Sequence, residues 1–165
     1  MPRPHLDTKK TMQLADFLDC DAIKTALPGG NKRSLFQQLA NIAAQRLALD
    51  PGTILAALNE REQLGPTGFG QGVAIPHARI EGLDRIYGLF ARLGEPVEYK
   101  AIDGRPVDLV FLLLSPADAG AGHLKALASI SRITRDAATL ERLRGARSRD
   151  ALAALLMGAD ELDAA

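Results

Sequence analysis

The sequence contains no tryptophan, only one cysteine and no excess of charge of either sign. Because Cys20 is the single cysteine, the chain cannot form an intrachain disulfide, which is consistent with a reducing compartment. We expect Cys20 to be a small buried residue. Twenty basic residues balance twenty acidic ones, so the chain lacks the basic excess on which nucleic-acid binding depends. The one basic cluster, Arg142, Arg144, Arg147 and Arg149, is interpreted as a solvated helix end.

Long apolar runs are also missing. The run Leu109 to Leu114, for example, has six residues, whereas a membrane-spanning helix needs about 20. The start of the sequence has no apolar segment of the kind found in signal peptides. We therefore expect a cytoplasmic protein without membrane insertion.

The length and composition indicate one globular domain. The chain has 165 residues, of which 47% are hydrophobic and 24% charged, close to the averages for globular proteins. We predict a domain over residues 13–157, preceded by a flexible polar tail over 1–12 and followed by a frayed acidic tail over 158–165. His5 lies in the first tail and is expected to be exposed and without a role.

Several segments have the patterns of helices. Apolar residues at helical spacing predict a helix over 34–48, after the capping candidates Asn31 and Ser34. The pair Asp50-Pro51 is typical of a second helix start, and Gly65-Pro66 ends that helix. Further helices are predicted from His123 onward, over 136–144 as a continuation or a separate turn, and after Ser148.

Other segments have the patterns of strands. A short strand is predicted over 73–75 and ended by Pro76, which cannot donate a ladder hydrogen bond. A second is predicted over 86–93, with a short candidate over 96–99. Val107 to Leu114 has seven apolar residues in eight, the pattern of a central strand covered on both faces. The fold class is therefore α/β, a single domain with a mixed β-sheet flanked by helices.

The glycine run Thr67-Gly-Phe-Gly-Gln-Gly72 is compared with nucleotide-binding motifs. A Walker loop needs lysine followed by serine or threonine and then a helix, and a dinucleotide fingerprint needs a strand before the glycines. This run contains no lysine and leads into a strand. It is interpreted as a tight turn that lets backbone segments approach closely.

Two histidines and one arginine are the candidates for chemistry. His77 follows Pro76 at the end of a predicted strand, where the ring is expected to point out of the sheet edge. His123 is predicted at a helix start, where the dipole favours a neutral imidazole and attracts anions. A neutral imidazole is a nucleophile toward phosphorus, and a phosphoryl group on His77 needs cationic or hydrogen-bonding partners, for which Arg61 and His123 are available.

Other interpretations remain open from the residues alone. The two histidines are also compatible with unrelated structural roles, and Arg61 with an arginine that reaches solvent at a helix end. A metal site has no HExxH or cysteine-rich spacing to support it, and a serine hydrolase has no Gly-x-Ser-x-Gly elbow.

Two longer segments resemble a known family. The run Arg61-Glu-Gln-Leu-Gly-Pro-Thr-Gly-Phe-Gly-Gln-Gly-Val-Ala-Ile-Pro-His77 resembles the active-site segment of fructose/mannitol-type enzyme IIA proteins of the bacterial phosphoenolpyruvate-dependent phosphotransferase system. The stretch from Ala101 to Lys125 resembles the second half of the same family. Similarity extends over about residues 13–157 and is strongest to the nitrogen-regulatory branch, although Ala78 stands where that branch frequently has glycine.

The resemblance implies a fold and a function. His77 corresponds to the histidine phosphorylated on Nε2 (tele-phosphohistidine), His123 to a residue that orients the phosphoryl group, and Arg61 to one that neutralises its charge. The phosphoryl donor would be an HPr-like phosphocarrier (NPr), and regulated partners would include potassium-transport or sensor-kinase components. No metal, nucleotide or other cofactor is implied. The alternatives are a sugar-specific enzyme IIA that passes phosphate to an enzyme IIB, and a binding module without phosphotransfer.

Overall fold

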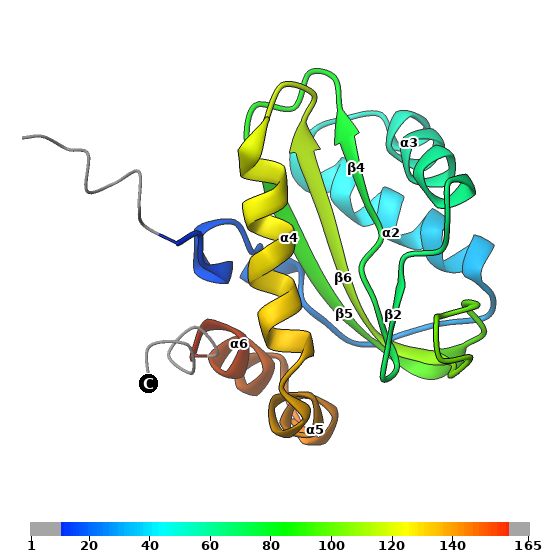
Figure 1. Cartoon of the computed structure of the whole chain (residues 1–165), viewed down its shortest axis with the longest axis vertical. Coiled ribbons are helices and arrows are strands. Elements are labelled where there is room, and N and C mark those ends of the chain that lie inside the picture. The colour runs from blue at the N-terminus through cyan, green and yellow to red at the C-terminus, as the bar shows by residue number, and fades with distance from the viewer. Residues whose placement is uncertain (1–10, 159–165) are drawn as a thin grey trace, which may run out of the picture.

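The computed structural model describes residues 11–158 as an α/β domain with helices on both faces of a sheet (Figure 1). Its strands are β1 (Lys24–Leu27), β2 (Gly68–Gly70), β3 (Val73–Ala74), β4 (His77–Ile80), β5 (Tyr87–Val97) and β6 (Val107–Pro116). Its helices are α2 (Lys32–Leu47), α3 (Pro51–Gln63), α4 (Ala121–Thr134), α5 (Ala137–Gly145) and α6 (Arg149–Gly158), with the 3-10 turns η1 (Leu14–Asp16) and η2 (Cys20–Ala22).

The sheet is mixed, as expected, and β6 lies at its centre. The strand order is β1-β5-β6-β3-β2, with β4 also paired to β6. β5 and β6 are antiparallel, whereas β3 and β4 both run parallel to β6. Residues 109–115 of β6 are all buried, which confirms the prediction of a strand covered on both faces.

Two apolar layers, one on each face of the sheet, form the core. One contains the inner faces of α2 and α3, and the other contains those of α4, α5 and α6. In Figure 1, α4 crosses the near face of β5 and β6 while α2 lies behind them. Alternate residues of β6 therefore pack into the two layers.

The predicted helix starts are confirmed, and their caps are visible. The Asn31 side chain accepts a hydrogen bond from the Ser34 amide at 2.7 Å and starts α2. Asp50 accepts one from the Thr53 amide at 3.0 Å, with Pro51 in the first turn of α3. Such caps satisfy amide groups that have no partner within the helix.

The strand before Pro76 ends at Ala74, as predicted, but pairing with β6 resumes directly after the proline. β3 pairs Ala74 with Val110, and β4 pairs His77 with Leu113, so the same register continues across the proline. Proline lacks an N–H, but the Pro76 carbonyl still accepts a hydrogen bond from the Leu113 amide at 3.0 Å. His77 therefore begins a second paired segment and is the first residue of β4.

Other boundaries differ from those predicted. The strand candidates over 86–93 and 96–99 belong to one strand, β5, whose register is irregular between Arg92 and Val97. α4 begins two residues before His123, and α5 is a separate helix. β1 and the two 3-10 turns were not predicted from the sequence.

The glycine run forms the expected tight turn. Gly70, Gln71 and Gly72, between β2 and β3, all have positive φ angles, of 103°, 58° and 81°. A Cβ atom on Gly68 would lie 2.7 Å from the backbone of Ala101. Glycine at this position therefore allows the close approach of two backbone segments, as predicted.

Two minor expectations were wrong. Arg144 is half-buried and its guanidinium pairs with both carboxylate oxygens of Asp108 at 2.8 Å, so the basic cluster is not a solvated end throughout. Cys20 is half-buried at the edge of the core and not fully buried.

The predicted tails lie outside the described residues except for Thr11, Met12 and Gly158. The Met12 carbonyl accepts a hydrogen bond from Arg132 at 3.1 Å.

Candidate active site

Arg61 is held at the end of α3 with its guanidinium facing the sheet. It lies in the last turn of the helix, and its Nη1 donates to the Gly65 carbonyl at 3.0 Å. Its Nε donates to Nε2 of His77 at 3.2 Å. The arginine therefore does not extend into solvent at a helix end, and the inward-facing alternative is the one observed.

The neighbouring Glu62 anchors the loop after α3. Its carboxylate accepts hydrogen bonds from the Thr67 amide at 2.8 Å and from the Thr67 hydroxyl at 2.7 Å, and pairs with Lys32 at 2.7 Å. The Thr67 hydroxyl also lies 2.8 Å from that of Tyr99. This network fixes the helix end on which Arg61 is carried.

His77 has a defined protonation pattern. Its Nδ1 lies 2.7 Å from the Ile75 carbonyl oxygen, which can only accept, so Nδ1 carries the proton. Nε2 then has the lone pair and accepts the hydrogen bond from Arg61. Burial lowers the pKa of His77 below its ordinary value, and the charge of Arg61 lowers it further. The ring is therefore neutral at physiological pH.

His123 is buried near the start of α4. It exposes 6% of its surface, and its Nδ1 lies 2.7 Å from the hydroxyl of Ser115, the penultimate residue of β6. Burial lowers the pKa of His123 to about 4, with smaller contributions from the positive charges of Arg79 and Arg61.

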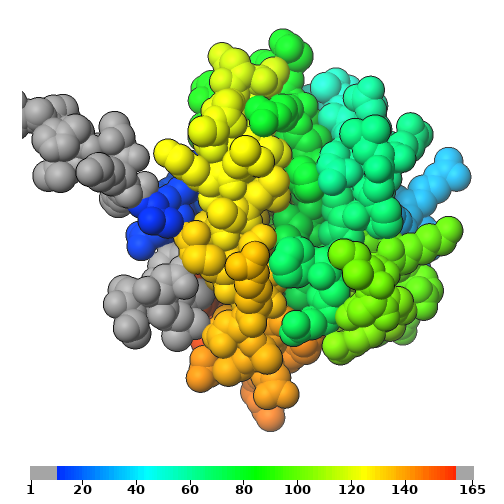
Figure 2. Space-filling model, in the orientation of Figure 1, coloured from blue at the N-terminus to red at the C-terminus, as the bar shows by residue number. Residues whose placement is uncertain are grey.

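The structure brings the three predicted residues together around one pocket. The ring centroids of His77 and His123 are 5.5 Å apart, with 48° between the ring planes. The pocket has a volume of about 460 Å³, and it is lined by Ala57, Glu60, Arg61, Leu64, His77, Ala78, Arg79 and His123. In Figure 2, α4 (yellow) and α3 (teal) bound this part of the surface, with the green strands between them.

Sequence reasoning missed Arg79 and Ser115. Arg79 follows His77 by two residues in β4, so strand alternation places both on one face, and this signal was present in the sequence. Ser115 is the only polar residue among the buried residues 109–115 of β6. Its partnership with His123 depends on how the loop returns to α4, which no local pattern indicates.

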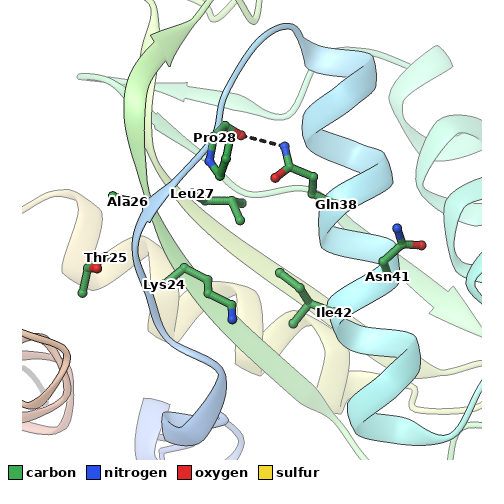
Figure 3. A pocket seen from close by; sticks show the side chains of 8 residues that line it. All are labelled: Lys24, Thr25, Ala26, Leu27, Pro28, Gln38, Asn41 and Ile42. Carbon is green, nitrogen blue, oxygen red and sulfur yellow. Dashed lines mark hydrogen bonds between the residues drawn. The ribbon is translucent and has the colours of Figure 1, made fainter.

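A second pocket of about 460 Å³ lies between β1 and α2 (Figure 3). Its lining contains one ionisable residue, Lys24, and amides such as Gln38, which donates to the Pro28 carbonyl at 2.6 Å. Its lining contains no histidine, cysteine, aspartate or glutamate. Of these two pockets, the one around the histidines is therefore the candidate active site.

Residues 11–158 contain neither a metal-binding cluster nor a membrane-spanning helix. No group of three or more histidine, cysteine, aspartate or glutamate side chains in that range is arranged to hold a metal ion. Within the same range, no helix has the length and apolar character needed to cross a bilayer.

Comparisons with known proteins identify the family of the chain. The model of the family "Phosphoenolpyruvate-dependent sugar phosphotransferase system, EIIA 2" matches residues 16–158. A nitrogen regulatory protein of Bradyrhizobium diazoefficiens is 44% identical over 145 residues, covering 88% of this chain and 95% of the relative. One of Escherichia coli is 36% identical over 143 residues, covering 86% and 88% of the two chains.

Solved structures show the same fold. The crystal structure of nitrogen regulatory protein IIA-Ntr from Neisseria meningitidis matches with a TM-score of 0.82 at 34% identity, over 87% of this chain and 98% of that one. The mannitol IIA of Escherichia coli matches with a TM-score of 0.71 at 20% identity, over 84% and 97% of the two chains. The chain therefore belongs to the EIIA type 2 family of the phosphoenolpyruvate-dependent sugar phosphotransferase system.

Proposed function

We propose that the chain is a cytoplasmic phosphocarrier that accepts a phosphoryl group on Nε2 of His77 from an HPr-like phosphocarrier. The observation that carries this proposal is the bond between Nδ1 of His77 and the Ile75 carbonyl. It leaves the lone pair on the nitrogen that faces Arg61. A neutral imidazole with a fixed lone pair is a ready nucleophile.

The transfer exchanges one nitrogen–phosphorus bond for another. The Nε2–P bond forms on His77 while the N–P bond of the donor phosphohistidine breaks, and the donor imidazole leaves with the electron pair. The proton on Nδ1 of His77 stays hydrogen-bonded to the Ile75 carbonyl. Because phosphoryl transfer passes through a loose transition state, positioning and charge stabilisation carry most of the catalysis. Arg61 and His123 supply that stabilisation, with Arg61 turning from the nitrogen to the phosphoryl oxygens.

The donor protein needs a surface to dock on. Leu64 lines the pocket and exposes 81% of its surface, and Leu124, next to His123, exposes 66%. Large exposed apolar residues beside a pocket are typical of protein–protein contacts. We assign this apolar rim to the HPr-like donor.

The output of the phosphorylation is regulatory. A phosphoryl group adds roughly two negative charges beside the apolar rim, enough to repel one partner and attract another. The relatives with the nitrogen regulatory name favour this role over sugar transport. Regulated partners would include components of potassium transport or sensor kinases.

A sugar-specific enzyme IIA is the second candidate function. The mannitol IIA of Escherichia coli is solved in complex with phosphorylated enzyme IIB, and it shares this fold at 19% identity. Such a role for this chain would require transfer from His77 to an enzyme IIB. The third candidate, a binding module without phosphotransfer, would need neither the fixed lone pair of His77 nor Arg61.

The proposal is tested by intact mass measurement at mildly alkaline pH. The protein is incubated with phosphoenolpyruvate, an enzyme I and an HPr-type carrier of the same organism. We expect one acid-labile phosphate on the wild type and on the control His5→Ala, and none on His77→Ala. Phosphate on His77→Ala, or none on the wild type, would contradict the proposal. Onward transfer to an enzyme IIB cysteine would favour the sugar-specific role.

A further inference from the structure

Ser115 is a buried polar residue whose hydroxyl faces a histidine. It exposes none of its surface, and the other residues of β6 from 109 to 114 are apolar. Its Oγ lies 2.7 Å from Nδ1 of His123. A hydroxyl in such a position must direct its single proton to an acceptor or leave it unsatisfied.

The hydrogen-bond partners decide the direction of this bond. Among residues 11–158, the Ser115 hydroxyl has no hydrogen-bond partner other than His123. If Nδ1 carried the proton and donated it, the serine proton would be buried without an acceptor, which is unfavourable. The serine therefore donates, Nδ1 accepts, and the proton of the neutral ring lies on Nε2.

The remaining nitrogen of His123 is available to the pocket. Its Nε2 has no hydrogen bond to any residue in the described range, and the ring lines the pocket next to His77. The contact with Ser115 thus leaves the N–H of His123 on Nε2, whereas the contact with the Ile75 carbonyl leaves the lone pair of His77 on Nε2. With centroids 5.5 Å apart, one ring presents a nucleophile and the other a donor to the same space.

We propose that Ser115 is a positioning residue that holds His123 in its Nε2-protonated form, so that the ring donates a hydrogen bond to the phosphoryl group bound at His77. The step from the ring to the phosphoryl group rests on the proposed function. The assignment of the ring proton does not, because it concerns the unphosphorylated protein. Ser115 acts only through His123 and is not expected to contact the phosphoryl group.

The ring proton is tested by NMR of the histidine ring nitrogens in the unphosphorylated protein at pH 7.5. In the wild type we expect an unprotonated Nδ1 and a protonated Nε2 for His123. In Ser115→Ala we expect both neutral forms, and in Ser115→Thr, which keeps the hydroxyl, the wild-type pattern. A protonated Nδ1 in the wild type would overturn the proposal without any variant, as would an unchanged pattern in folded Ser115→Ala.

Ser129→Ala is the matched control. Ser129 is also buried and lies on α4, but its hydroxyl donates to the Ala126 carbonyl at 2.8 Å and not to a ring. Its removal should leave the His123 spectrum unchanged, which separates loss of the ring contact from general loss of a buried hydroxyl.

Phosphoryl acceptance supplies the second readout. Loss of one hydrogen bond of ordinary strength predicts a phosphorylation rate about fivefold lower in Ser115→Ala, with Ser115→Thr restoring the rate. An altered ring pattern with an unchanged rate would overturn the link to the phosphoryl group. If the wild type takes no phosphate while its ring pattern is as expected, the proposed function fails and the assignment of the ring proton stands.

Discussion

The two sides of the pocket hold their histidines by different means. On the β4 side, His77 is fixed by a backbone carbonyl, that of Ile75, whereas on the α4 side His123 is fixed by a side-chain hydroxyl, that of Ser115. A carbonyl persists through any substitution that keeps the backbone in place, but a hydroxyl is lost with one residue. The protonation pattern of His77 therefore depends on the backbone alone, whereas that of His123 depends on which side chain stands at position 115.

The two sides also differ in charge. The β4 side has the guanidinium of Arg61 in direct contact with His77 at 3.2 Å, whereas His123 stays neutral because burial lowers its pKa to about 4. A charged donor stabilises an anion more strongly than a neutral one. We therefore expect substitutions on the arginine side to have the larger effects.

Arg61→Gln should have the largest effect of the substitutions that keep His77. It removes the positive charge in contact with the nucleophile, and loss of one such preorganised donor typically slows a reaction about 100-fold or more. The rate of phosphoryl acceptance from the HPr-type carrier measures this. Arg147→Gln, at an exposed arginine, is the control and should react at the wild-type rate. A rate within twofold of wild type for Arg61→Gln would show that the β4 side does not dominate.

His123→Phe should have a smaller effect on the same rate. Phenylalanine keeps a ring of similar size but has no N–H, so the phosphoryl group loses one neutral donor and the transfer slows about tenfold. Phosphorylation should remain confined to His77. A loss as large as that of Arg61→Gln would contradict the difference between the two sides.

Acidification should lower the free energy of unfolding because of His123, the histidine on the α4 side. The unfolded histidine takes up its proton near pH 6.5 and the folded His123 only near 4, so between these values the unfolded state binds more protons. The free energy of unfolding should therefore fall by about 2 kcal/mol from pH 7 to pH 5 through His123 alone. His77, whose pKa is also lowered, adds in the same direction.

Urea unfolding at the two pH values measures this loss, with His123→Phe as the comparison. The pKa of Asp19 is lowered below its ordinary 3.8, so this carboxylate stays ionised throughout the window and does not mimic the effect. The variant should lose less stability than the wild type on acidification. Equal losses would show that His123 titrates at its ordinary pKa.

Much of the site could be predicted from the sequence because its signals are local. The segment from Arg61 to His77 carries both residues, and strand alternation from His77 indicates Arg79. Ser115 could not be predicted, because its contact with His123 depends on how the loop over 117–120 returns the chain from β6 to α4. The anchoring of Glu62 near Tyr99, 37 residues away, likewise requires the folded chain.

The fold shows the same division between local and distant signals. Helix starts were predicted at Asn31 and Asp50 because a helix cap involves only three or four neighbouring residues. The strand break at Pro76 was predicted because its missing N–H is a local fact, but the resumed pairing at His77 was not, because the partner for the Pro76 carbonyl comes from β6. β1, four residues long at the sheet edge, has too little apolar pattern to be recognised.

The most direct test of the central claim is to identify the phosphorylated nitrogen. The protein is labelled with nitrogen-15 in histidine, phosphorylated by enzyme I and an HPr-type carrier, and examined by phosphorus and nitrogen NMR. We predict a single phosphohistidine, with phosphorus on Nε2 of His77 and the proton still on its Nδ1. Phosphorus on Nδ1 of His77, or on either nitrogen of His123, would contradict the account.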